Sequence, residues 1–175
     1  MKRLYVLIFL FSTLLQAGVT PGQLAVLQKV RDVARTVPDK WGETYENTLS
    51  AICITESSAG RNIIGDFEDG VKITRASLGA MQVQVATARY VSKKVDALAS
   101  IKTMSDKEVA NALLSDIDFS ARIAAHYLVI LKNRRQDYMH SVSGYNGGTE
   151  NWPYFSRVMK NMELVKSLVA SGELK

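Results

Sequence analysis

The feature that most constrains the fold is the helical spacing of apolar residues along almost the whole chain. Apolar side chains recur at steps of three and four residues, which is the period of one face of an α-helix. This spacing predicts helices around residues 24–37, 44–57, 81–95, 105–113, 119–130 and 151–169. The chain is therefore expected to be mainly α.

Helix-start signals support this prediction. Ser105 and Glu108 form a capping box, and either Asp116 or Asp118 can cap the following helix. Asn151, with a proline in the first turn, suits the start of the last one. These signals place helix boundaries that apolar spacing alone leaves open.

One stretch of the chain suits β-structure. Between the second and third helical segments lie glycines and clustered acids, together with Ile63, Val71 and Ile73. Such a pattern predicts a small β-hairpin around residues 63–76. No repeat or flexible linker divides the rest, so we expect one domain over residues 19–175.

The start of the chain is typical of a secretory signal peptide. A basic beginning is followed by an apolar run, Leu4 to Leu15, and then by the small residue Ala17. The alternative is a membrane anchor, but the run is shorter than the roughly 20 residues that cross a bilayer. We expect residues 1–18 to be removed and the mature protein to be exported, without a stable membrane span.

Composition excludes other classes of protein. Cys53 is the only cysteine, so no internal disulfide can form, and its apolar neighbours favour a buried side chain over a nucleophile. The net charge of +5 is a mild bias without interleaved basic and aromatic residues, so we expect no nucleic-acid partner. His126 and His140 lack the spacing of metal ligands.

Glu56 is the most informative single residue. It follows Leu49 and Ile52 at helical spacing, which places a carboxylate on an apolar helix face. Burial there would raise its pKa and make it a proton donor near neutral pH. The alternatives are a buried glutamate satisfied by a partner and a helix end that faces solvent.

Two further stretches combine glycines with amides. Residues 77–82 place Gln82 where a helix is expected to begin, and residues 143–148 place Tyr145 and Asn146 between glycines. Such groups can bind N-acetyl groups and sugar hydroxyls. Taken singly, the first could be an ordinary helix start and the second a tight turn.

In order along the chain, these stretches resemble the three signature motifs of the soluble lytic transglycosylase family, usually written E-S, G-L-M-Q and A-Y-N-A-G. The matching residues are Glu56-Ser57, Gly79-Ala80-Met81-Gln82 and Gly144-Tyr145-Asn146-Gly147-Gly148. Residues 116–128 and Tyr154-Phe155-Ser156-Arg157-Val158 resemble two flanking segments of the family. The resemblance covers a motif core of about residues 44–158.

The resemblance implies a lysozyme-like fold and a peptidoglycan substrate. Glu56 would protonate the β-1,4 oxygen between N-acetylmuramic acid and N-acetylglucosamine, then act as base while a 1,6-anhydro ring closes. Single-carboxylate chemistry of this kind implies no metal and no cofactor.

Supporting roles also follow from the resemblance. Ser57 would orient the Glu56 carboxylate, and Met81 and Gln82 would line the sugar subsites. Tyr145 would hydrogen-bond near Glu56, and Asn146 would contact an N-acetyl group.

A second family offers an alternative. The residues after Glu56 also resemble goose-type lysozymes, which are muramidases that hydrolyse the same polymer. Asp66 or Asp69 could then be a second carboxylate. However, Gln84 replaces the acid that those lysozymes carry after the second motif. A third alternative is a protein that binds peptidoglycan without cutting it.

Location, oligomeric state and partners follow from the signal peptide, from the lack of an exposed heptad seam and from the resemblance. We expect a monomer in the periplasm or cell envelope. A small catalytic domain of this kind is similar to enzymes that open the wall for a secretion or conjugation apparatus.

Overall fold

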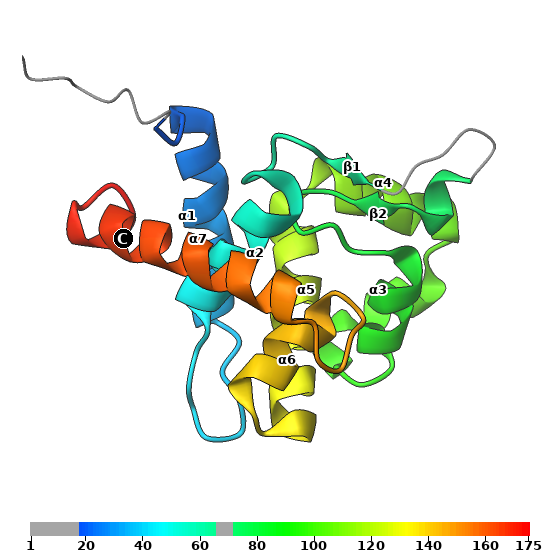
Figure 1. Cartoon of the computed structure of the whole chain (residues 1–175). Helices are drawn as coiled ribbons and strands as arrows, with labels where there is room; N and C mark the ends of the chain where they lie inside the picture. The colour runs from blue at the N-terminus through cyan, green and yellow to red at the C-terminus, as the bar shows by residue number, and fades with distance from the viewer. Residues whose placement is uncertain (1–17, 66–71) are drawn as a thin grey trace, which may run out of the picture.

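The computed structural model describes residues 18–65 and 72–175, which form a mainly helical chain with one small sheet (Figure 1). The helices are α1 (Pro21–Arg35), α2 (Glu46–Ser57), α3 (Val85–Ser92), α4 (Asp106–Ser115), α5 (Ile117–Arg135), α6 (Tyr138–Tyr145) and α7 (Trp152–Ala170). Two 3-10 helices, η1 (Ile73–Arg75) and η2 (Asp96–Thr103), and two strands, β1 (Ile64–Gly65) and β2 (Ser77–Leu78), complete the described elements. The predicted class, mainly α with a small hairpin, is confirmed.

Helix α2 lies at the centre of the packing. It contacts α1, α5 and α7, and Figure 1 shows α7 lying across it. Its residues Leu49, Ile52 and Cys53 are fully buried, as the apolar spacing predicted. Because α2 is held on several sides, a side chain at its C-terminal end has a fixed position.

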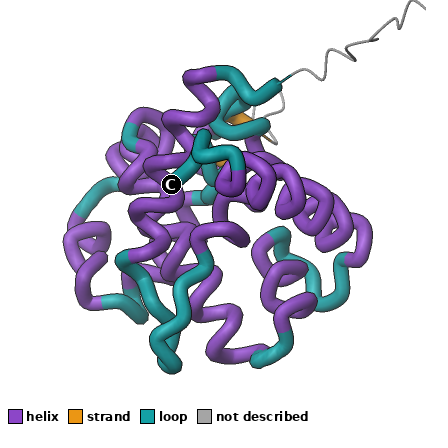
Figure 2. The backbone as a smooth tube through the Cα atoms, turned by 90° about the vertical axis from the view of Figure 1, so that its left-hand side faces the viewer, coloured by secondary structure: helices purple, strands orange, loops and turns teal. Residues whose placement is uncertain are grey.

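The sheet is a minor feature. Strands β1 and β2 pair antiparallel, with Ile64 opposite Leu78 and Gly65 opposite Ser77. Figure 2 shows these two short strands confined to one part of a molecule that is otherwise helix and loop. They connect the end of α2 to the segment that precedes α3.

Several predicted caps are confirmed. Ser105 and Glu108 form the capping box of α4, and Asp116, rather than Asp118, caps α5. Asn151 accepts a hydrogen bond from the Tyr154 backbone N–H at the start of α7. These local interactions satisfy backbone donors that the first helical turn leaves unpaired.

Other predicted details are wrong. Ile73 lies in η1 rather than in a strand, because the hairpin pairs residues nearer the two ends of the stretch. Met81 lies in a turn, and α3 begins only at Val85. Helix α6, which contains His140, was not among the predicted helices.

Some predictions fall outside the described residues. Asp66, Asp69 and Val71 lie there, as does the predicted signal peptide except for Gly18. Within residues 18–65 and 72–175, no helix has the length and apolar character needed to cross a membrane.

Candidate active site

Glu56 lies in the last turn of α2 and is partly buried. The helix ends because the chain turns into the left-handed region at Ser58 and Ala59, with φ of 52° and 55°. The N–H groups of these two residues donate to the carbonyls of Ile54 and Cys53. The turn fixes the direction in which the chain leaves α2, so the carboxylate is presented at a defined helix end.

The Glu56 carboxylate accepts a hydrogen bond from Tyr154. The Tyr154 hydroxyl lies 2.6 Å from Oε1 of Glu56, and the tyrosine is only 1% exposed. Burial, together with the nearby Glu56 charge, raises the pKa of Tyr154 far above its ordinary value. The phenol therefore stays protonated and acts as a donor. Tyr154 was not among the predicted site residues.

Ser57 joins the end of α2 to the second motif. Its hydroxyl donates to the Ala80 carbonyl at 2.6 Å and accepts from the Gly60 N–H at 2.7 Å. The side chain is 1% exposed. Ser57 thus influences Glu56 through the backbone on which both residues lie, and its predicted orienting role stays a prediction.

The second motif is a tight turn that follows β2. Its ends are joined by backbone hydrogen bonds between Leu78 and Val83, and Gly79 and Gln82 have φ of 74° and 48°. A Cβ atom on Gly79 would lie 2.0 Å from the Leu113 carbonyl oxygen, so only glycine fits there. The turn is therefore packed directly against α4.

Gln82 is held by its own turn. Its side-chain NH₂ group donates to the carbonyls of Asn62 and Gly79, at 3.1 and 2.9 Å. Its Oε1 faces Gly65, where an added Cβ would approach within 2.2 Å. These contacts fix the amide and make Oε1 the atom left to accept from a ligand.

Tyr145 connects the third motif to the second. It ends α6, and its hydroxyl donates to the Met81 carbonyl at 2.9 Å. The Met81 side chain is fully buried, so the residue faces the core and contributes its backbone to this contact. Burial and the nearby Glu56 carboxylate raise the pKa of Tyr145 well above its ordinary value.

Asn146 follows Tyr145 and is exposed. Its Oδ1 accepts a hydrogen bond from the Asn151 side chain at 3.0 Å. With the oxygen engaged in this way, the NH₂ group of Asn146 is available as a donor.

The three motifs meet at one cavity of about 430 Å³. Of the predicted residues, Glu56, Gln82, Tyr145 and Asn146 line it, whereas Ser57 and Met81 do not. The other lining residues are Gly65, Ser77, Val83, Gln84, Thr87, Tyr127 and Gly147. A cavity of this size that carries an acid, three amides and tyrosines can hold a sugar unit.

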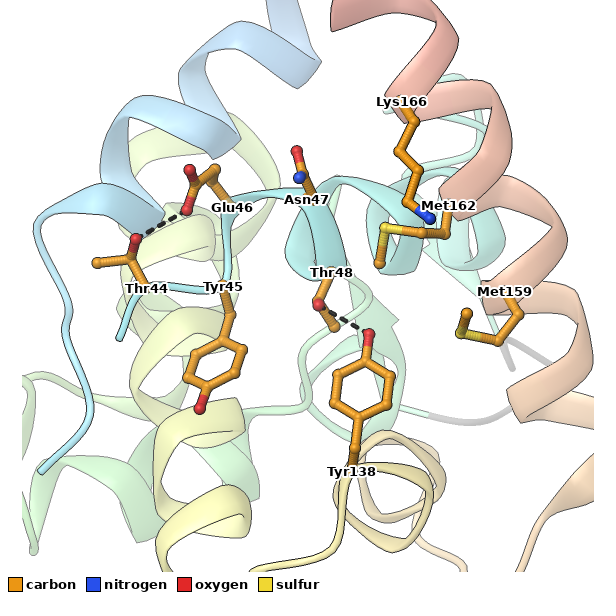
Figure 3. A pocket seen from close by; sticks show the side chains of 9 residues that line it. All are labelled: Thr44, Tyr45, Glu46, Asn47, Thr48, Tyr138, Met159, Met162 and Lys166. Atoms are coloured by element: carbon orange, nitrogen blue, oxygen red, sulfur yellow. Dashed lines mark hydrogen bonds between the residues drawn. The ribbon is translucent and has the colours of Figure 1, made fainter. Parts of the chain in front are cut away.

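A second cavity, of about 320 Å³, lies at the other end of α2 (Figure 3). Figure 3 shows the Tyr138 hydroxyl meeting that of Thr48, at 2.9 Å, and Met159 and Met162 projecting from α7. None of the predicted site residues that the structure describes lines it. The cavity beside Glu56 is therefore the candidate active site.

In the described part of the chain, neither Cys53 nor a cluster of metal-binding side chains offers a second candidate for the chemistry. Cys53 is fully buried, as predicted, and burial raises the pKa of its thiol to about 12. Among the residues that the structure describes, no group of three or more His, Cys, Asp or Glu side chains could hold a metal ion.

Comparison with known protein families gives a match. A family model described as Transglycosylase SLT domain matches residues 39–161, a range that contains every residue assigned above to the cavity. No curated protein and no solved structure matches the chain.

Proposed function

The chain belongs to the transglycosylase SLT domain family, which acts on peptidoglycan and has a lysozyme-like fold, and we propose that it is a lytic transglycosylase with Glu56 as its catalytic acid and base. The bond broken would be the β-1,4 link between N-acetylmuramic acid and N-acetylglucosamine. The product would carry a 1,6-anhydromuramoyl end.

One observation carries this proposal: Glu56 lines a sugar-sized cavity and is held there by Tyr154 at 2.6 Å. The acid needs a fixed position because proton transfer requires hydrogen-bond distance to the reacting oxygen. Tyr154 supplies that restraint from α7, which packs against α2. The buried phenol ring cannot move away without opening the core.

The reaction needs two proton transfers at one carboxylate. Protonated Glu56 gives its proton to the glycosidic oxygen as the bond to the muramoyl C1 breaks, and N-acetylglucosamine leaves as an alcohol. The Glu56 carboxylate then takes the proton of the muramoyl C6 hydroxyl, whose oxygen bonds to C1 and closes the ring. Glu56 ends protonated, as it began, and no water is consumed.

The Tyr154 hydroxyl fits both steps. It donates to Oε1 of Glu56, so it stabilises the carboxylate that forms when the proton leaves. The carboxylate that Tyr154 holds is then the group that exchanges the proton with substrate. Tyr154 acts here through Glu56 and is a positioning residue.

The amides would hold the sugar. Oε1 of Gln82 is placed to accept from a sugar hydroxyl or an N-acetyl N–H, and the NH₂ group of Asn146 to donate to an N-acetyl carbonyl. Ser57 and Met81 would support these groups from behind the cavity wall.

The test compares Glu56→Gln with the wild-type protein on purified peptidoglycan. Wild type should clear the polymer and release muropeptides with anhydro ends by mass spectrometry, whereas Glu56→Gln should lose at least about 10³-fold in rate, since it removes the only proposed acid. Glu163→Gln is the matched control, because Glu163 is an exposed carboxylate on α7.

Each alternative has its own result. Equal clearing by wild type and Glu56→Gln would overturn the catalytic assignment. Reducing ends would indicate hydrolysis, as in goose-type lysozymes, with Asp66 or Asp69 as the second carboxylate. Binding of peptidoglycan without clearing by wild type would indicate a non-catalytic protein. Export to the periplasm or envelope, and service to a secretion or conjugation apparatus, stay predictions.

A further inference from the structure

We propose that Arg135 is a positioning residue for the third motif, and that residue 144 is glycine because the Arg135 guanidinium occupies the place of a Cβ atom. The proposal rests on the function assigned above to the Glu56 cavity. It concerns residues 144–148, which are named the third-motif loop.

Arg135 joins helix α6 to the last residue of the third-motif loop. It is the last residue of α5, and the chain reverses immediately after it at Gln136, where φ is 60°. Its Nη1 donates to the carbonyl oxygen of His140 in α6, at 2.5 Å, and to that of Gly148, at 2.9 Å. One guanidinium nitrogen therefore bridges the body of α6 and the far end of the loop.

The guanidinium lies directly against Gly144. A Cβ atom built on Gly144 would be 2.5 Å from Nη1, 2.7 Å from Cζ and 3.1 Å from Nη2 of Arg135. The distances to Nη1 and Cζ are shorter than real Cβ contacts, and the distance to Nη2 is tighter than most of them. An alanine here would displace the end of the flexible arginine side chain and so break its bonds to the two carbonyls. Gly144 stands where the family motif quoted above has alanine.

This contact controls residues that line the cavity. Tyr145, Asn146 and Gly147 lie between Gly144 and Gly148, and all three line the cavity with Glu56. The near end of the loop is also held from α5, since the Tyr127 hydroxyl donates to the Gly144 carbonyl at 3.3 Å. Loss of the Arg135 bridge would free the far end and shift the Asn146 amide away from substrate.

A double-mutant cycle tests the proposal, with Gly144→Ala, Arg135→Ala and the double variant compared with wild type. Each single variant should raise KM for peptidoglycan about tenfold, within the range found for residues in contact, with a smaller change in kcat. The KM of the double variant should be no higher than that of either single variant. In the double variant, the Cβ of residue 144 fills space that the guanidinium has left. Arg134→Ala, at the exposed neighbouring arginine, removes the same charge and should keep the wild-type KM.

Two results would overturn the proposal. One is independence of the two changes, in which the fold-increase in KM of the double variant equals the product of the two single increases. The other is a wild-type KM in Arg135→Ala. The melting temperatures of the four proteins measure the coupling between residues 135 and 144 without any catalysis. They therefore separate failure of this proposal from failure of the proposed function. Arg135→Lys should recover part of the loss, since a lysine can donate to one of the two carbonyls.

Discussion

Tyr154 carries a hydroxyl on the buried face of α7, and this hydroxyl reaches Glu56. In Tyr154→Phe the ring still fills its site, but Glu56 loses a charge-assisted hydrogen bond worth about 1.5–3 kcal/mol. We expect kcat on peptidoglycan to fall about 10- to 100-fold. Tyr138→Phe, which removes a partly buried hydroxyl bonded to Thr48 outside the catalytic cavity, should keep the wild-type rate. A Tyr154→Phe enzyme as fast as wild type would contradict the role assigned to this tyrosine.

The same residue shows what sequence can predict at this scale. Tyr154 shares helical spacing with Val158, Met162 and Val165, so its burial was predictable. A buried phenol needs a hydrogen-bond partner, and this requirement was the available signal. Its partner lies 98 residues earlier in the chain. Periodicity within one helix cannot identify a partner at that separation.

At the scale of elements, the turn of the second motif depends on its packing against α4. Gly79→Ala would place a Cβ atom 2.0 Å from the Leu113 carbonyl oxygen, so backbone must move. Gly172→Ala is a matched control, because Gly172 also has a positive φ, 80° against 74°, but has nothing within 4 Å of an added Cβ. We expect Gly79→Ala to lose about 1–3 kcal/mol more unfolding free energy than Gly172→Ala, measured in urea. Equal losses would show that backbone strain alone accounts for both.

Elements were predicted well where a local signal specifies them. Ser105 and Asp116 cap helices as expected, because a cap is an interaction over three residues. The turn at Met81 was predicted as helix, because Met81 and Val85 have helical spacing and both are buried. Met81 lies instead in a turn that packs on α4 through Gly79, a long-range contact that spacing does not reveal.

Helix α6 and the loop that follows it are also joined by His140, which contacts Glu150 at 3.2 Å and Asp137 at 2.7 Å. These carboxylates raise the pKa of His140 above the ordinary 6.5, whereas burial and then the nearby Arg122 lower that of His126. NMR titration of the two histidines should therefore give His126 the lower and His140 the higher midpoint. The reverse order would contradict the structure.

The direction of the His140 shift sets a pH dependence for stability. The pKa of His140 is higher in the folded protein than in the unfolded chain. Its contribution to the free energy of unfolding is therefore fully present below about pH 6.5 and is lost as pH rises through the folded pKa. The difference in unfolding free energy between wild type and His140→Gln should shrink over that range. A difference that grows with pH would contradict the two contacts.

At the scale of the whole molecule, one core holds the fold without a disulfide. The buried cluster draws side chains from every helix from α1 to α7, and Cys53 lies within it at 0% exposure. The sequence predicted this burial from the apolar neighbours of Cys53. The order in which the helices surround α2 was not predictable, because each helix has an apolar face that could pack against any other.

The position of Cys53 makes its thiol a reporter of global unfolding. Burial raises its pKa to about 12 and excludes reagents, so labelling requires the core to open. We expect a thiol reagent at pH 8 to leave the native protein unlabelled and, in increasing urea, to react along the unfolding curve given by circular dichroism. In the control, Cys53→Ala with Ser156→Cys, the thiol sits on the exposed face of α7 and should react at once without urea. If Cys53 reacted as fast as that control in native protein, α2 would open locally while the rest stayed folded, and the rigid support that the structure gives Glu56 would not exist.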